Sequence, residues 1–174
     1  MRSTVLIVID VQTGLFTEPG YPVYQKDSIL RNINALIAKA RSADVPVFFV
    51  QHTESEGPLQ LNTPGWKIHS ALDVRDSDVR FIKTSPDSFY KTPLESLLKD
   101  RGITDLVLCG LQTEYCVDTT TRSAFSHGYR TFLVSDAHST YDNDLLKASQ
   151  IVAHHNGILR SFADLKTTQD IQFK

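Results

Sequence analysis

Short apolar runs alternate with segments of helical periodicity along the whole chain, and this alternation limits the possible folds more than any other feature. The first run, at 5–9, is uninterrupted, as expected of a strand buried on both faces of a sheet. We predict strands at 5–9, 45–50, 79–82, 106–109 and 131–134, and an edge strand at 158–160. Because strands recur between helices, the sequence predicts an α/β fold: a doubly wound, six-stranded, mostly parallel sheet with helices on both faces.

The intervening helices are predicted at 28–40, 92–101, 116–127 and 145–156. Asp27 or Ser28 caps the first helix, whose apolar residues recur at helical spacing. The second begins at 92–95, a capping box with proline at the first helical position. Residues 53–78 show no periodicity, and we predict a long loop there, which is either functional or contains a short helix.

The length of 174 residues indicates one domain that spans residues 1–174. The net charge of −2 offers no basic surface for nucleic acid, and no apolar run is long enough to span a membrane. The apolar run after the first residues is too short for a signal peptide, so we expect a cytoplasmic location. The two cysteines, Cys109 and Cys116, fit neither a disulfide framework nor a C-x-x-C motif.

Three chemically reactive residues occupy equivalent places at the ends of predicted strands. Asp10 follows the first strand, Lys83 follows the third, and Cys116 lies just beyond the fourth, near the start of a helix. The carboxyl ends of parallel strands share one edge of a sheet, where ligands bind, so we expect the three side chains to meet. Taken one at a time, Asp10 could be only a turn residue, Lys83 an ordinary surface lysine and Cys116 a structural thiol. A helix start and a nearby lysine favour the thiolate of Cys116 and predict rapid alkylation even at low pH. Cys109 lies within an apolar strand and is interpreted as a packing residue.

Several motifs resemble those of the isochorismatase-like cysteine hydrolases, which include nicotinamidases and N-carbamoylsarcosine amidohydrolases. The resemblance covers nearly the whole chain, and its most specific segment is centred on Cys116. The matching segments are Leu-Ile-Val-Ile-Asp10-Val-Gln, Phe-Ile-Lys83 with Ser88-Phe89, Cys-Gly110-Leu-Gln-Thr-Glu-Tyr-Cys116-Val, and Thr119-Thr-Thr-Arg-Ser-Ala-Phe-Ser-His-Gly128.

The resemblance implies a catalytic triad of Asp10, Lys83 and Cys116. It also implies a cis peptide bond between Leu111 and Gln112, which turns the N–H of Gln112 toward that of Cys116 to form an oxyanion hole. Members of this family are commonly dimers or tetramers, so we expect a homo-oligomer that acts on a small molecule. A mechanism built on this triad requires no organic cofactor, and we expect none.

Two departures from the nicotinamidase pattern bear on the substrate. Nicotinamidases place an Asp-x-His and a further His after the second strand to bind a metal, whereas residues 51–56 here read Gln-His-Thr-Glu-Ser-Glu. Gln112 also stands where a small residue is common. We therefore expect no metal, and nicotinamide is disfavoured as the substrate. The alternative, that His52 and Glu54 bind a metal, lacks an evident third ligand.

Other side chains near the strand ends are candidates for contacts with the substrate: Gln12, Phe16, His52, Glu54, Trp66 and Phe89. Both phenylalanines could equally belong to the core. Trp66 could instead anchor the long loop or contact a partner subunit.

These features together predict a hydrolase that cleaves an amide or carbamoyl C–N bond of a small molecule through a thioester on Cys116. Three alternatives stay open. A vinyl-ether hydrolase of the isochorismatase type needs no thiol, and a thiol redox enzyme would require a resolving cysteine. A non-catalytic nucleotide-binding domain would require a glycine-rich phosphate loop, which the segment after Gly110 does not provide.

Overall fold

The computed structural model describes residues 3–173. Its strands are β1 (Thr4–Ile9), β2 (Val47–His52), β3 (Val79–Lys83), β4 (Asp105–Leu111), β5 (Arg130–Ser139) and β6 (Asp164–Lys166). Its helices are α1 (Thr13–Thr17), α2 (Lys26–Ser42), α3 (Leu94–Lys99), α4 (Asp118–Ser126) and α5 (Ala148–Ile158), with a π-helical turn η1 (Thr113–Val117) and a 3₁₀ turn η2 (Leu159–Ser161).

The six strands form one sheet in the order β3-β2-β1-β4-β5-β6, and every neighbouring pair is parallel. The predicted α/β class with a doubly wound sheet is therefore confirmed, and the described sheet is entirely parallel. The strand order reverses between β1 and β4. In open parallel sheets the crevice at such a reversal is where ligands bind.

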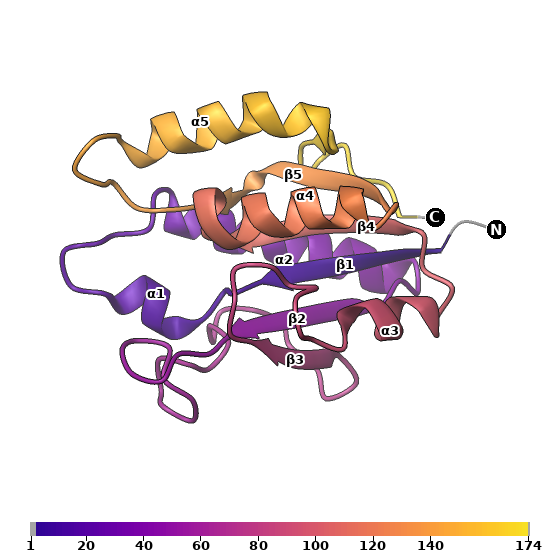
Figure 1. Cartoon of the computed structure of the whole chain (residues 1–174), viewed down its shortest axis with the longest axis horizontal. Coiled ribbons are helices and arrows are strands. Elements are labelled where there is room, and N and C mark those ends of the chain that lie inside the picture. Colours follow the sequence, from indigo (N-terminus) through magenta and orange to yellow (C-terminus); the bar gives the residue numbers. More distant parts are fainter. Residues whose placement is uncertain (1–2, 174) are drawn as a thin grey trace.

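Helices cover both faces of the sheet. Along β1, alternate residues point to opposite faces, so Leu6 and Val8 pack in the cluster that includes α2, while Val5 and Ile7 pack in the cluster that includes α3 and α4. Figure 1 shows α2 on the side of the sheet opposite to α3 and α4. Because β1 contributes to both cores, its buried residues 5–9 are all apolar, as the sequence predicted.

The edge strand predicted at 158–160 is wrong. These residues end α5 and begin η2, and the sixth strand is β6, a few residues further on. Leu159 is fully buried against the core on the side of α3 and α4, so its apolar character serves helix packing. The helix predicted from Leu145 begins later, at Ala148, because Asn143 Oδ1 accepts the N–H groups of Leu145 and Leu146 and forms a turn there.

Gly110 does not end the fourth strand, which continues to Leu111. Its φ of 124° lies in the region that favours glycine, and a Cβ atom there would lie 2.0 Å from the carbonyl oxygen of Ile9. The glycine thus lets β4 approach β1 closely at the strand-order reversal. Residues 53–78 form a long loop, as predicted, in which isolated β-bridges are the regular backbone pairing. Among residues 3–173, none of the helices has the length and hydropathy needed to span a membrane.

Candidate active site

The three predicted strand-end residues meet at the carboxyl edge of the sheet. The Nζ of Lys83 lies 2.7 Å from Oδ2 of Asp10 and donates a hydrogen bond of 3.1 Å to Sγ of Cys116. Asp10 follows β1, Lys83 ends β3, and Cys116 lies in η1 after β4. The parallel topology therefore brings together residues from three separate parts of the chain, on both sides of the strand-order reversal.

Asp10 is held in an unusual environment. Its φ of 51° places it in the left-handed region, which is uncommon for residues other than glycine. The side chain is buried, and its Oδ1 has no hydrogen-bond donor among the described residues. The contact of Oδ2 with Lys83 is short but lacks the geometry of a directed hydrogen bond. A buried carboxylate with one oxygen free can accept a proton from a neighbouring group.

The thiol of Cys116 is protonated at rest. Burial and the negative charge of Asp10 raise its pKa to about 12, and the opposing effect of Lys83 is smaller. The expectation of a resting thiolate was therefore wrong. Cys116 lies inside η1, which continues directly into α4. Its sulfur is more buried than a thiol at the exposed start of a surface helix would be. The geometry instead suits transfer of the thiol proton during attack.

Lys83 remains charged although it is buried. Burial opposes its charge, but the carboxylate of Asp10 raises its pKa, which lies above the ordinary lysine value. Its ammonium also donates to Nδ1 of His52 at 3.2 Å and to the carbonyl oxygen of Ser85 at 3.1 Å. These contacts fix the ammonium between the carboxylate and the thiol.

One group of potential metal ligands occurs among the described residues. Ligand atoms of Asp10, His52 and Cys116 all lie within 4.8 Å of one another. The Lys83 ammonium, however, lies between them, at 2.7, 3.2 and 3.1 Å from the respective atoms. It occupies the position that a metal ion would take, so this donor set does not fit a metal while Lys83 is charged. Burial and the Lys83 charge also lower the pKa of His52, which keeps its imidazole neutral.

A cavity of about 240 Å³ opens onto the sulfur of Cys116. Its lining residues are Asp10, Leu15, His52, Glu54, Leu59, Pro86, Gln112, Tyr115 and Cys116. Of the predicted substrate contacts, His52 and Glu54 therefore lie in the cavity. Four further lining residues were not predicted from the sequence: Leu15, Leu59, Pro86 and Tyr115. The closeness of Leu15 to Asp10 and of Tyr115 to Cys116 in the sequence was the only feature that could have indicated them.

The other predicted substrate contacts do not line this cavity. Gln12 is fully buried, and its amide clamps the long loop to the sheet: Nε2 donates to the carbonyl oxygens of His52 and Trp66, and Oε1 accepts the N–H of His52. Trp66 Nε1 donates to Thr53 Oγ1, in agreement with the alternative that it anchors the loop.

Both phenylalanines among these candidates pack against other side chains. Phe16 packs on His69, and Phe89 is buried and stacked on His127. They belong to the packing around the site and not to the cavity wall, which was the alternative considered for them.

The turn that carries Cys116 is secured by a histidine that sequence reasoning missed. Asn156 Nδ2 donates to the carbonyl oxygen of Ser135, so its Oδ1 accepts from Nε2 of His138 at 3.0 Å. Nδ1 of His138 is then an acceptor for the hydroxyl of Thr113 at 2.9 Å. These bonds join β5 and α5 to the first residue of η1. The sequence contained no spacing that pointed to His138.

The peptide bond between Leu111 and Gln112, immediately before η1, is cis.

The chain matches the family model of the isochorismatase domain over residues 4–169. It is 38% identical to the streptothricin hydrolase of Streptomyces noursei over 138 residues, which are 79% of this chain and 54% of that protein. It is 29% identical to the ureidoacrylate amidohydrolase of Methylobacterium radiotolerans over 171 residues, covering 78% of this chain and 66% of that protein. The chain thus spans about half the length of the first relative and about two thirds of the second.

A crystal structure described as an isochorismatase family protein superposes on this fold with a TM-score of 0.90 and 35% sequence identity, covering 94% of this chain and 98% of that one. The family model, the relatives and this structure agree with the resemblance that the motifs around Asp10, Lys83 and Cys116 indicated. The chain therefore belongs to the isochorismatase family of hydrolases.

Proposed function

We propose that this hydrolase cleaves the C–N bond of a small amide or carbamoyl compound through a thioester on Cys116. The observation that carries the proposal is the position of the Lys83 ammonium, 2.7 Å from Asp10 and 3.1 Å from the sulfur of Cys116. A nucleophile, a proton acceptor and a fixed cation at one cavity are the components of covalent acyl transfer. The name of one relative, an amidohydrolase, supports the choice of an amide bond.

In the first half of the reaction, Cys116 transfers its thiol proton to Asp10 as the sulfur attacks the carbonyl carbon. The charge that develops on the carbonyl oxygen is held by the backbone N–H groups of Gln112 and Cys116. When the C–N bond breaks, Asp10 returns the proton to the leaving nitrogen, and an amine or ammonia departs. Lys83 keeps its charge throughout, and its ammonium fixes the positions of the Asp10 carboxylate and the Cys116 sulfur relative to each other.

In the second half, water enters the cavity and Asp10 accepts one of its protons while the oxygen attacks the thioester. The tetrahedral intermediate collapses, the C–S bond breaks, and Cys116 recovers its proton from Asp10. The acid is released and the resting thiol is restored. Besides the substrate and this water, each step uses only Asp10, Lys83, Cys116 and the backbone N–H groups of Gln112 and Cys116.

A second candidate reaction is the cleavage of a vinyl ether without a thiol nucleophile. The observation that favours it is the pKa of about 12 at Cys116, because a thiol that stays protonated is a poor nucleophile. In that reaction Asp10 would first take up a proton from solvent and transfer it to the vinyl ether, water would attack the resulting cation, and Asp10 would accept a proton from that water as the C–O bond breaks.

A panel of small amides and carbamoyl compounds, assayed for the release of ammonia or amine, tests the proposal. With an active compound, rapid acid quenching and intact-mass measurement should detect an acyl adduct on the wild type and none on Cys116→Ala. Turnover by Cys116→Ala at a rate near that of the wild type would contradict the thioester route and favour the thiol-independent reaction.

A further inference from the structure

We infer that the substrate carries a positive charge, such as an ammonium or amidinium group, close to its scissile bond. This inference rests on the proposed function, since it concerns the same cavity, and it adds the chemical class of the substrate. It follows from the charge of the cavity wall, from the lack of a cation that balances that charge, and from the hydrogen-bonding atoms that face the cavity.

The charges inside the cavity sum to a negative value. The ammonium of Lys83 balances the carboxylate of Asp10, and His52 is neutral because burial and Lys83 lower its pKa. Cys116 is a neutral thiol. The remaining charged residue of the lining is Glu54, and no lysine or arginine is among the described residues of that lining.

Glu54 has no cationic partner among the described residues within ion-pair distance. It is positioned by backbone instead: its Oε2 accepts the N–H of Leu59 at 3.3 Å, and the residue forms a β-bridge with Gln60. Gly57, with a φ of 97°, lies so near that a Cβ atom would be 3.1 Å from the same Oε2. The loop therefore holds an unbalanced carboxylate at the cavity wall.

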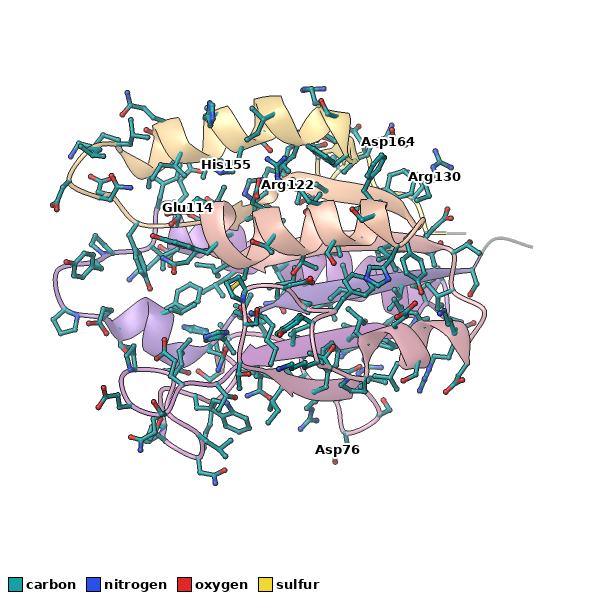
Figure 2. All side chains as sticks on the ribbon, viewed as in Figure 1. Asp76, Glu114, Arg122, Arg130, His155 and Asp164 are labelled. Carbon is teal, nitrogen blue, oxygen red and sulfur yellow. The ribbon has the colours of Figure 1, made fainter. Side chains whose placement is uncertain are left out.

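A second carboxylate, that of Glu114, is linked to Gln112 through the hydroxyl of Thr140 and does not itself line the cavity. The hydroxyl of Thr140 donates to Oε1 of Glu114 at 2.8 Å, so the longer contact of 3.5 Å from Gln112 must be donated by its Nε2. The amide of Gln112 thus directs its N–H₂ toward Thr140 and leaves its carbonyl oxygen as the unengaged end. Oε2 of Glu114 is buried and has no donor among the described residues. Figure 2 shows Glu114 at the end of the molecule where the strands terminate, beside the start of α4.

Apart from the two N–H groups assigned to the oxyanion hole, the side-chain oxygens of Glu54 and Gln112 at the cavity are hydrogen-bond acceptors, and the charge of the lining is negative. A substrate with ammonium or amidinium N–H groups complements them, whereas a carboxylate next to the scissile bond meets like charge at short range. The apolar side chains of Leu15, Leu59 and Pro86 provide a surface for the hydrocarbon part of the same molecule. The volume of about 240 Å³ suits a small compound or one arm of a larger one.

Three matched amides test this inference: one skeleton that bears an ammonium, a neutral methyl or a carboxylate group at the same position. For the wild type, we expect kcat/KM to fall in that order, by at least about tenfold between the ammonium and carboxylate compounds. Glu54→Gln keeps an acceptor for the N–H of Leu59 and removes the charge. The ratio of kcat/KM for the ammonium compound to that for the carboxylate compound should therefore fall toward one. Glu56→Gln, an exposed residue of the same loop, is the matched control and should leave the ratio unchanged.

A second measurement does not depend on turnover. Alkylation of Cys116 by iodoacetamide at pH 9 should be slowed by n-butylammonium and much less by butyrate, and Glu54→Gln should abolish that difference. Absence of turnover on all three amides together with this protection pattern would contradict the proposed function but support the inference. Preferential protection by butyrate, or faster turnover of the carboxylate compound, would overturn the inference whether or not amides are cleaved.

Discussion

The ammonium of Lys83 and the carboxylate of Asp10 form a buried ion pair of 2.7 Å, and the two groups have opposite effects on the thiol beside them. Asp10 raises the pKa of Cys116 and Lys83 lowers it, while burial raises it further. The reactivity of the thiol therefore reports on the charge of each neighbour, and this can be measured before any substrate is known.

The first prediction concerns alkylation of Cys116. Because its pKa is about 12, labelling by iodoacetamide should be slow at pH 7 and rise about tenfold per pH unit toward alkaline pH. Asp10→Asn removes the negative charge and should lower the pKa, so labelling at pH 7 should become faster while turnover falls. Lys83→Met should slow labelling. Intact-mass kinetics from pH 6 to 9 measure all three rates, and slower labelling of Asp10→Asn than of the wild type would contradict the proposed role of the carboxylate.

The second prediction separates the two cysteines. Cys116→Ala should unfold with nearly the same free energy as the wild type but lose turnover by on the order of 10³-fold or more, because the covalent route is removed. Cys109 is fully buried in the core of β4, and Cys109→Ala should cost about 1 kcal/mol of stability with turnover largely kept. Urea unfolding and amide hydrolysis, measured side by side on both variants, provide the comparison.

Much of the fold and the centre of the site could be predicted from the sequence. Continuous apolar runs such as β1 are forced by burial on both faces, and parallel topology then places the residues that follow β1, β3 and β4 at one edge. Asp10, Lys83 and Cys116 were therefore expected to meet, and they do. The resting thiol could not be predicted from the sequence, because the pKa of Cys116 depends on how burial and two opposite charges balance in three dimensions.

The cavity wall was harder to predict because it depends on the course of residues 53–78. Gln12 is polar and near the strand end, like a substrate contact, but all its hydrogen bonds described above go to backbone groups of the loop and β2. The prediction of an edge strand at 158–160 was wrong because an apolar residue such as Leu159 can be buried from the end of a helix as well as from a strand. Short apolar runs do not distinguish these two cases.

The third prediction concerns metal ions. Since Lys83 lies between Asp10, His52 and Cys116, exhaustive chelation should leave turnover unchanged, and wild-type protein should bind zinc weakly. Lys83→Ala frees the three donor groups and should increase zinc affinity, a change that calorimetry can measure. His52→Ala in the Lys83→Ala background is the control and should remove the gain. Restoration of lost activity by stoichiometric zinc in the wild type would contradict this prediction.

The fourth prediction is a pH-dependent stability that arises from His138. Burial lowers the pKa of His138 to about 4, from the ordinary value of 6.5, so the folded state disfavours the protonated ring that the unfolded chain accepts. The contribution of this group to the free energy of unfolding should therefore be fully present above about pH 7.5 and be lost as the pH decreases toward 4, with a loss of about 2 kcal/mol between pH 8 and 5. His52 and His69 also have lowered pKa values and add to the slope in the same direction, so the contribution of His138 has to be measured by difference.

His138→Gln removes the titrating ring, and urea unfolding at several pH values should show a shallower loss of stability than the wild type over this window. His154→Gln, at an exposed position of α5, serves as the control and should keep the wild-type slope. Because Nδ1 of His138 accepts the hydroxyl of Thr113 at the start of η1, loss of this bond should also loosen the turn that carries Cys116. Hydrogen exchange of the η1 amides should then rise in His138→Gln at pH 7, where the His138 ring of the wild type is neutral. Equal pH slopes for His138→Gln and the wild type, together with unchanged exchange in η1, would show that the buried ring neither titrates as described nor holds the turn.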